Sequence, residues 1–352
     1  MLFYPGRQTL HTVVICSTCR IFKREISNRM YIEERERERV YKLTYVAGCG
    51  NSQKHSIWME LFRVLSIGVL LLAINANEVI SASCDYPAIF NFGDSNSDTG
   101  GISAAFYPPA SPSGQTYFHR PAGRASDGRL LAGHLGLPYL NPYLDSIGSI
   151  GSSYRHGTNF ATGGATILRP DESWFLNGVS PFSLEIQVEH YTQLKDRTAY
   201  FHKAKKKSHM KKLPRPDDFS KSLFLLDIGQ NDVAASIRKR SSAVPEVVSH
   251  FIAQIKTLYE REAKIFWIHN TGPIGCLPVA AVKVQNPVAA GYLDEHGCVK
   301  SQNDIAIELN KQLKNEILKL RSELSSEAKI IYVDMYSAKL ELITTAYNQD
   351  KH

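Results

Sequence analysis

The short sequence FNFGDSNSDTGG, residues 90–101, changes abruptly from an apolar run to glycine, serine, asparagine and aspartate. This change is typical of a short buried strand that stops at a tight turn. In an open α/β sheet, ligands bind at the carboxyl ends of the strands. Ser95, which follows the predicted strand, is therefore a candidate nucleophile.

Three further apolar runs rich in β-branched residues have the same character, at residues 222–228, 263–270 and 328–334. Continuous apolar runs suit strands that are buried on both faces, as in a parallel sheet. Between these runs, residues 244–262 and 304–324 carry apolar stripes at helical spacing. Alternating strands and helices predict an α/β fold, a three-layer sandwich in which helices flank a central parallel sheet.

The charge distribution argues against a nucleic-acid partner. The chain of 352 residues is 43% hydrophobic and has a formal net charge of +7. Residues 1–58 hold ten Lys or Arg and five Asp or Glu, and residues 59–83 carry −1, which leaves about +3 from Cys84 onward. This is too little for the basic surface that nucleic-acid binding needs. The lysine-rich residues 203–212 are predicted to form a solvated surface loop, with contact to an anionic surface as the alternative.

Residues 59–83 have the composition of a secretory signal peptide. Arg63 lies in a short first region, residues 64–74 are apolar, and residues 81–83 are small enough for a cleavage site. The apolar run is too short to span a bilayer comfortably. We therefore expect a protein that begins near Cys84, is secreted to the extracellular space or cell wall, and has no membrane span after cleavage.

Residues 1–58 precede this signal-like segment and show no sustained apolar period. Their run EERERERV, residues 33–40, alternates charge without an apolar face. We interpret residues 1–58 as an extension upstream of the true start. The alternative is a cytoplasmic tail on a signal anchor.

Three cysteines lie in the part that we expect to be secreted, where disulfides are permitted. Cys276 and Cys298 flank a loop rich in proline and glycine, so we predict that they pair. Cys84 is then a free thiol or lacks its partner. The earlier pair Cys16 and Cys19 has no second ligand pair, so no metal or redox site is expected there.

The sequence GDSNSDTG fits two other patterns only in part. As the start of an EF-hand loop it would need glycine at position six and an acidic residue at position twelve, where Thr99 and Ala105 stand. As a nucleophile elbow it lacks the second glycine of G-x-S-x-G. An ordinary strand-ending turn remains the simplest alternative to a catalytic site.

Two further windows supply groups that acyl transfer requires, namely HGTNFATGGAT (residues 156–166) and LLDIGQND (residues 225–232). Acyl transfer needs a nucleophile and hydrogen-bond donors that face the developing oxyanion. Ser95, the backbone N–H of Gly164 and the side chain of Asn231 fill these roles if the strand ends are neighbours.

Together these blocks resemble the plant GDSL esterase/lipase family of the SGNH hydrolases, in its early-nodulin-like and α-fucosidase-like branch. GRASDGRL, GLPYL and IHNTGPIGCLPV extend the resemblance over nearly all of residues 84–352. It implies an SGNH/flavodoxin-like fold and a secreted, lipid-degrading serine esterase that acts on a small-molecule acyl ester. Ser95 would be the nucleophile, and the Ser95 amide, Gly164 and Asn231 the oxyanion hole. Neither a metal nor an organic cofactor is implied, and we expect a monomer.

The family's Asp-x-x-His block, whose histidine is the general base, does not occur in this sequence. A neutral serine is a poor nucleophile without an adjacent base. Asp350 and His352 have the right residue types at the wrong spacing, and we interpret His156 and His269 as structural or solvated. We therefore expect a hydrolase domain that is truncated at its C-terminus and catalytically impaired. The alternative is a secreted non-catalytic protein that binds acyl or glycan esters in the same pocket.

Overall fold

The computed structural model describes residues 86–107, 110–111, 113–121, 123–126, 139–147, 153–170, 180–239, 243–284, 289–324 and 326–349. The predictions for residues 1–58, for the signal-like residues 59–83, for Cys84 and for His352 lie outside these residues. None of the described helices is both long enough and apolar enough to cross a membrane.

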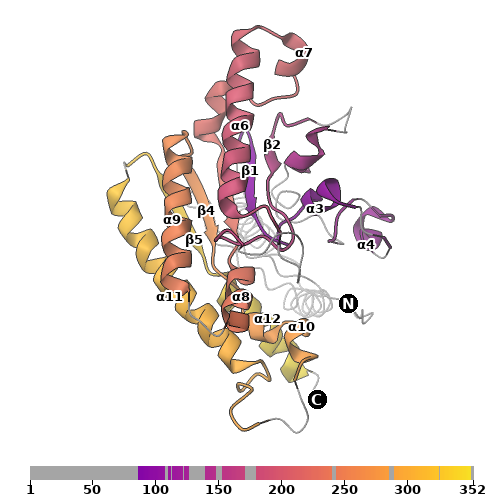
Figure 1. Cartoon of the computed structure of the whole chain (residues 1–352), viewed down its shortest axis with the longest axis vertical. Coiled ribbons are helices and arrows are strands. Elements are labelled where there is room, and N and C mark those ends of the chain that lie inside the picture. The colour runs from indigo at the N-terminus through magenta and orange to yellow at the C-terminus, as the bar shows by residue number, and fades with distance from the viewer. Residues whose placement is uncertain are drawn as a thin grey trace, which may run out of the picture. The chain divides into compact units, whose positions relative to one another are not determined.

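Five parallel strands form the central sheet of the described residues (Figure 1): β1 (Ile89–Gly93), β2 (Gly157–Asn159), β3 (Leu223–Asp227), β4 (Ile265–His269) and β5 (Lys329–Val333). Their order across the sheet is β2-β1-β3-β4-β5. Four of them coincide with the predicted apolar runs, which confirms the predicted α/β fold. The sequence pattern does not predict β2, because three residues are too few to show a period.

The central strands are apolar on both faces. Phe90, Phe224 and Phe266 are in register on three adjacent strands, and their ring centroids lie 5.2 Å and 5.8 Å apart in turn. Side chains alternate between the faces of a strand. Trp267, the next residue along β4, is buried as well. Both faces of the sheet are therefore covered, as expected of the middle layer of a three-layer sandwich.

Three long helices pack together against this sheet (Figure 1): α6 (Leu184–Lys203), α9 (Val244–Glu260) and α11 (Lys300–Glu323). Helix α9 lies between the other two and contacts both. It has proline in its first turn, where the missing N–H costs no hydrogen bond. Helix α11 begins at Lys300, four residues before the predicted start, because its first turn contributes little to the apolar stripe.

The remaining helical segments are short or lie at the ends of the sheet: α3 (Gly101–Ala105), α4 (Gln115–Phe118), α7 (Lys207–Met210), α8 (Gln230–Lys239), α10 (Pro278–Ala281), α12 (Met335–Gln349), and the 3₁₀ helices η1 (Tyr143–Ile147), η3 (Pro216–Lys221) and η4 (Ile274–Cys276). The lysine-rich residues 203–212 are almost entirely exposed, as predicted. They are not all loop, because the N–H of Met210 donates to the carbonyl of Lys206 (3.0 Å) and closes the single turn of α7.

A disulfide joins Cys276 and Cys298, which confirms the predicted pairing. Closing a loop of about twenty residues restricts the unfolded chain and stabilises the fold by about 3 kcal/mol. The carboxylate of Asp294 also holds this loop, since its Oδ1 accepts the N–H groups of His296 (3.0 Å) and Cys298 (2.9 Å). Its Oδ2 accepts a hydrogen bond from Nδ2 of Asn303 (3.0 Å).

Candidate active site

Three turns meet at the carboxyl edge of the sheet, where β1, β2 and β3 end. Ser95 follows β1, Gly164 follows β2, and Asn231 lies in the first turn of α8 after β3. Strand β1 lies between β2 and β3, so the chain changes its direction of strand addition at this point. Ligand sites of open α/β sheets form at such a switch point.

The turn that carries Ser95 lies directly against the turn after β2 that contains Gly163 and Gly164, the glycine turn. A methyl group added at Gly163 would lie 3.8 Å from Cβ of Ser95. Ser95 is exposed, whereas Asp94 before it and Ser97 after it are buried. Of the two serines in this turn, Ser95 is therefore the one that a substrate can reach.

The glycine turn offers a backbone donor beside Ser95. Gly164 has a φ of 82°, a left-handed conformation that favours glycine. Its carbonyl accepts the N–H of Ser180 (2.9 Å), but its own N–H donates to none of the described residues. Nδ2 of Asn231 donates to the carbonyl of Ala165 (2.8 Å), which uses one of its two N–H bonds. The structure thus brings Ser95, Gly164 and Asn231 together. Among the described residues, the N–H of Gly164 and the second N–H of the Asn231 side chain have no acceptor.

Gln187 of α6 holds the end of β1 immediately before this turn. Its side chain is fully buried, its Oε1 accepts the N–H of Gly93 (2.8 Å), and its Nε2 donates to the carbonyl of Gly93 (2.9 Å). A Cβ at Gly93 would lie only 2.4 Å from the carbonyl oxygen of Asp227, so only glycine fits there. Gln187 cannot be recognised as a site residue from the sequence, because a contact across 94 residues leaves no local pattern.

Two buried asparagines hold the other end of the turn. Nδ2 of Asn91 donates to Oδ1 of Asn159 (2.7 Å), and Nδ2 of Asn159 donates to the carbonyl of Ser97 (2.6 Å). Both asparagines are nearly inaccessible to solvent. These hydrogen bonds tie the Ser95 turn to β2 as well as to β1.

Asp232 connects the first turn of α8 to the segment after the glycine turn. Its carboxylate accepts the N–H groups of Ile167 (2.9 Å to Oδ2) and Leu168 (3.2 Å to Oδ1). Burial raises the pKa of Asp232 to about 7, although these two hydrogen bonds act in the opposite direction. The neighbouring Asn231 is therefore held in place by its own bond to Ala165 and by this carboxylate.

A pair of buried carboxyl groups lies beneath the Ser95 turn. Burial, together with the charge of Asp227, raises the pKa of Asp94 to about 8. Burial also raises the pKa of Asp227, but His269, Lys339 and Asn96 outweigh it, and this pKa lies below its ordinary value. Asp94 is therefore the protonated member of the pair at neutral pH, and its Oδ1 accepts the N–H of Asn96 (3.0 Å) within the turn.

We expect Asp94→Asn to remove a pH dependence of stability. The unfolded carboxyl ionises near 3.8, whereas the folded one holds its proton to about 8. The native state therefore binds more protons than the unfolded state in this window, and the free energy of unfolding of the wild type falls as pH rises through it. Asparagine does not ionise, so the variant should gain stability relative to the wild type between these pH values.

Urea unfolding of both proteins at several pH values across this window measures the effect. Asp217→Asn, which changes an exposed carboxyl group, is the matched control. A stability difference between Asp94→Asn and the wild type that stays constant with pH would contradict the prediction.

His269 ends β4 at the same edge of the sheet, but it faces Asp227. Its Nδ1 lies 3.4 Å from Oδ2 of Asp227, an ion-pair separation without the alignment of a hydrogen bond, and the residue is 7% exposed. Strand β3 separates it from β1. His156 lies at the opposite edge, where its Nδ1 is 3.3 Å from the carbonyl of Pro87. Neither position is that of a base in contact with Ser95.

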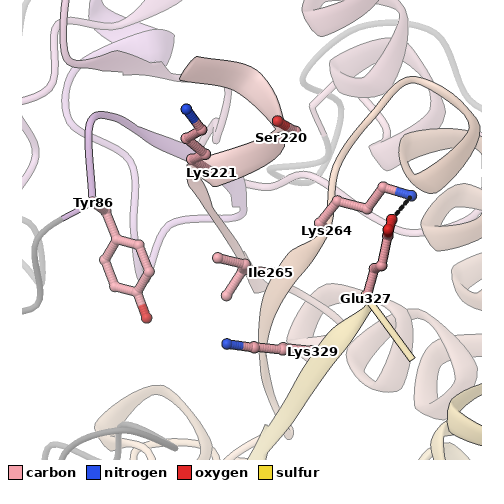
Figure 2. A pocket seen from close by; sticks show the side chains of 7 residues that line it. All are labelled: Tyr86, Ser220, Lys221, Lys264, Ile265, Glu327 and Lys329. Atoms are coloured by element: carbon pink, nitrogen blue, oxygen red, sulfur yellow. Dashed lines mark ion pairs between the residues drawn. The ribbon is translucent and has the colours of Figure 1, made fainter. Parts of the chain in front are cut away.

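An open pocket of about 410 Å³ lies at the amino ends of the strands (Figure 2). Ile265 and Lys329, which begin β4 and β5, line it together with Tyr86 before β1. Figure 2 shows Lys264 directed at Glu327, and their N–O distance is 3.7 Å. Because the amino and carboxyl ends of parallel strands lie at opposite edges, this pocket is separate from the candidate active site.

Comparison with known proteins identifies the family. The model of the GDSL-like lipase/acylhydrolase family matches residues 89–349. A GDSL esterase/lipase of Arabidopsis thaliana is 48% identical over 284 residues, which cover 78% of this chain and 72% of that protein. Alpha-L-fucosidase 3 of Arabidopsis thaliana is 45% identical over 273 residues, which cover 75% of this chain and 72% of that protein. The GDSL esterase/lipase ENOD8 of Medicago truncatula is 42% identical over 292 residues, which cover 80% and 73%.

These matches confirm the resemblance found in the sequence. All five strands and the three turns around Ser95 lie within the matched residues. The chain belongs to the family of GDSL-like lipases and acylhydrolases, which are hydrolases of ester bonds.

Proposed function

We propose that the protein is a carboxylic-ester hydrolase in which Ser95 is the nucleophile. The N–H groups of Ser95 and Gly164 and the side chain of Asn231 form its oxyanion hole. One observation carries this proposal: an exposed serine lies against a glycine turn whose N–H is unbound among the described residues, and Asn231 is bonded to the same turn. Donors fixed in this way stabilise the negative charge that develops on a carbonyl oxygen.

In the proposed reaction, Oγ of Ser95 attacks the carbonyl carbon of a small acyl ester and loses its proton to a base. The carbonyl oxygen becomes an oxyanion that the three donors bind. The alcohol then leaves with a proton, and water releases the acid from the acyl-enzyme. Each step uses only side chains, backbone amides and water, and the proposed enzyme is a monomer.

The base is the part of this machinery that the sequence does not supply. No Asp-x-x-His occurs in the chain, and His269 faces Asp227 rather than the Ser95 turn. We therefore propose that these 352 residues hydrolyse esters poorly. The same observation favours the second candidate function, binding of acyl or glycan esters without turnover. An added base separates the two. Ester turnover that then appears, and that Ser95→Ala removes, supports the hydrolase over the binding protein.

We also propose that the protein is secreted, to the extracellular space or cell wall, and that residues 1–58 are absent from the mature protein. The signal-like composition of residues 59–83 supports this. N-terminal sequencing of protein from the producing tissue should find a first residue near Cys84, because cleavage follows small residues. Recovery of peptides from residues 1–58 would show that the extension is translated and retained.

A further inference from the structure

We propose that Asp98 is a positioning residue for the oxyanion hole. Its carboxylate accepts the N–H of Gly163 and so holds the peptide between Thr162 and Gly163 against the turn that carries Ser95. This inference rests on the proposed function, because it assigns Asp98 a role only if Ser95 and the N–H of Gly164 act together.

The carboxylate of Asp98 accepts four backbone N–H groups and is 5% exposed. Oδ1 accepts the N–H groups of Gly100 (2.7 Å) and Gly101 (2.5 Å). Oδ2 accepts those of Ile102 (3.3 Å) and Gly163 (2.8 Å). The first three belong to the start of α3, and the fourth belongs to the turn after β2. One side chain therefore joins two segments that are 65 residues apart in the sequence.

At Gly101 the two segments approach each other too closely for any residue other than glycine. A Cβ at Gly101 would lie 2.6 Å from the carbonyl oxygen of Ala161. A Cβ at Gly163 would lie 3.6 Å from Oδ2 of Asp98 and 3.8 Å from Cβ of Ser95. Asp98 and Ser95 thus contact the same glycine from the same turn, and the carboxylate bridges both backbones.

This contact determines where the N–H of Gly164 lies. Two successive glycines can adopt many backbone conformations, so in an unrestrained turn the N–H of Gly164 would point in many directions. The bond from Gly163 to Asp98 restricts that freedom, because it fixes the peptide immediately before the one that carries the donor. A donor contributes to transition-state stabilisation only when it is already in place as the charge develops. Asp98 supplies this preorganisation without contacting the substrate.

The guanidinium group of Arg124 supports the carboxylate with an opposite charge. Arg124 is 8% exposed and lies over the rings of Phe118 and Tyr139, with centroid distances of 5.3 Å and 5.6 Å. It interacts electrostatically with Asp98. A buried positive charge nearby attracts the two oxygens that accept these four hydrogen bonds.

Asp98→Asn separates the contacts of Oδ1 from those of Oδ2. Asparagine keeps the acceptor that Gly100 and Gly101 need, and it is a favourable residue at a helix start. Its NH₂ group then stands in place of Oδ2 and meets the N–H groups of Gly163 and Ile102, which a donor cannot accept. Asp98→Ser is a second variant with the same logic, since serine also caps helices but is too short to reach Gly163.

Asp294→Asn is the matched control. Asp294 also accepts two backbone N–H groups through Oδ1 and a third hydrogen bond through Oδ2, but it does so in the disulfide loop. Its substitution therefore removes the same chemical group from a similar network that lies apart from the Ser95 turn.

The test uses the full chain and two measurements: hydrogen exchange of the Gly163 amide, and the Kd of an alkylboronic acid. Oγ of Ser95 adds to the boron and releases its proton to solvent, and the oxygen of the tetrahedral adduct occupies the oxyanion hole. In Asp98→Asn and Asp98→Ser we expect faster exchange at Gly163 and about 10- to 100-fold weaker boronate binding, since small misplacements carry costs of this order. Asp294→Asn should bind boronate like the wild type, and Ser95→Ala should not bind it.

The outcomes separate the two proposals. Wild-type affinity for boronate in a folded Asp98→Asn or Asp98→Ser protein would overturn the role of Asp98 and leave the role of Ser95 intact. An equal loss of affinity in Asp294→Asn would also overturn it, because the effect would then follow from general destabilisation. If Ser95→Ala bound boronate as tightly as the wild type, the proposed function would be overturned, and the role of Asp98 with it.

Discussion

Joining an Asp-x-x-His segment of a family member to the chain should raise its hydrolysis of p-nitrophenyl acetate by several orders of magnitude. Ser95 has donors beside it but no described base in contact with it. In triad hydrolases, loss of the base costs several orders of magnitude in rate, while the oxyanion hole and substrate binding leave a small residual rate. The chain alone should therefore turn over this ester only marginally above background.

The measurement is kcat/KM of the chain, of the joined protein, and of the joined protein with Ser95→Ala. Ser95→Ala should remove the gain completely, because Ser95 is the group that forms the acyl-enzyme in the proposed reaction. Ser208→Ala, which changes an exposed serine of α7, should keep it. Robust turnover by the chain alone that depends on Ser95 would show that another residue acts as base. His269 and His352 are then the first two residues to substitute.

In the joined protein, Asn231→Ala should lower kcat by roughly 10²–10³, the usual loss for one oxyanion donor. The donor contributes mainly when the carbonyl oxygen becomes negative, so KM should change little. Asn231→Asp should lose at least as much, because it removes the N–H groups and places a negative charge beside the oxyanion. Steady-state kinetics on a p-nitrophenyl ester measure both variants.

Asn303→Ala is the control for the loss of a buried amide. Asn303 accepts the N–H of Gly275 (2.9 Å) and donates to Asp294, so its removal costs stability in a different part of the molecule. A folded Asn303→Ala protein should keep its kcat. If Asn231→Ala lowered kcat no more than this control, Asn231 would only anchor the loop through Ala165.

The main elements of the fold could be predicted because their evidence is local. Strands that are buried on both faces must be apolar along their whole length, so β1, β3, β4 and β5 appear in the sequence as continuous apolar runs. Helix α9 shows its apolar stripe within its own residues. The abrupt end of the run before Ser95 likewise marks the turn at the carboxyl end of β1. Each of these conclusions needs only neighbouring residues.

The environment of Ser95 could not be predicted in this way. Gln187 binds the backbone of Gly93 from 94 residues away, and Asp98 binds Gly163 across 65 residues. Nothing in the sequence near Asp94 shows that burial raises the pKa of its carboxyl group to about 8. The order of the strands decides which turns become neighbours, and local patterns carry no information about that order. Which N–H groups stay free, and which carboxyl groups stay charged, therefore depends on how distant segments pack.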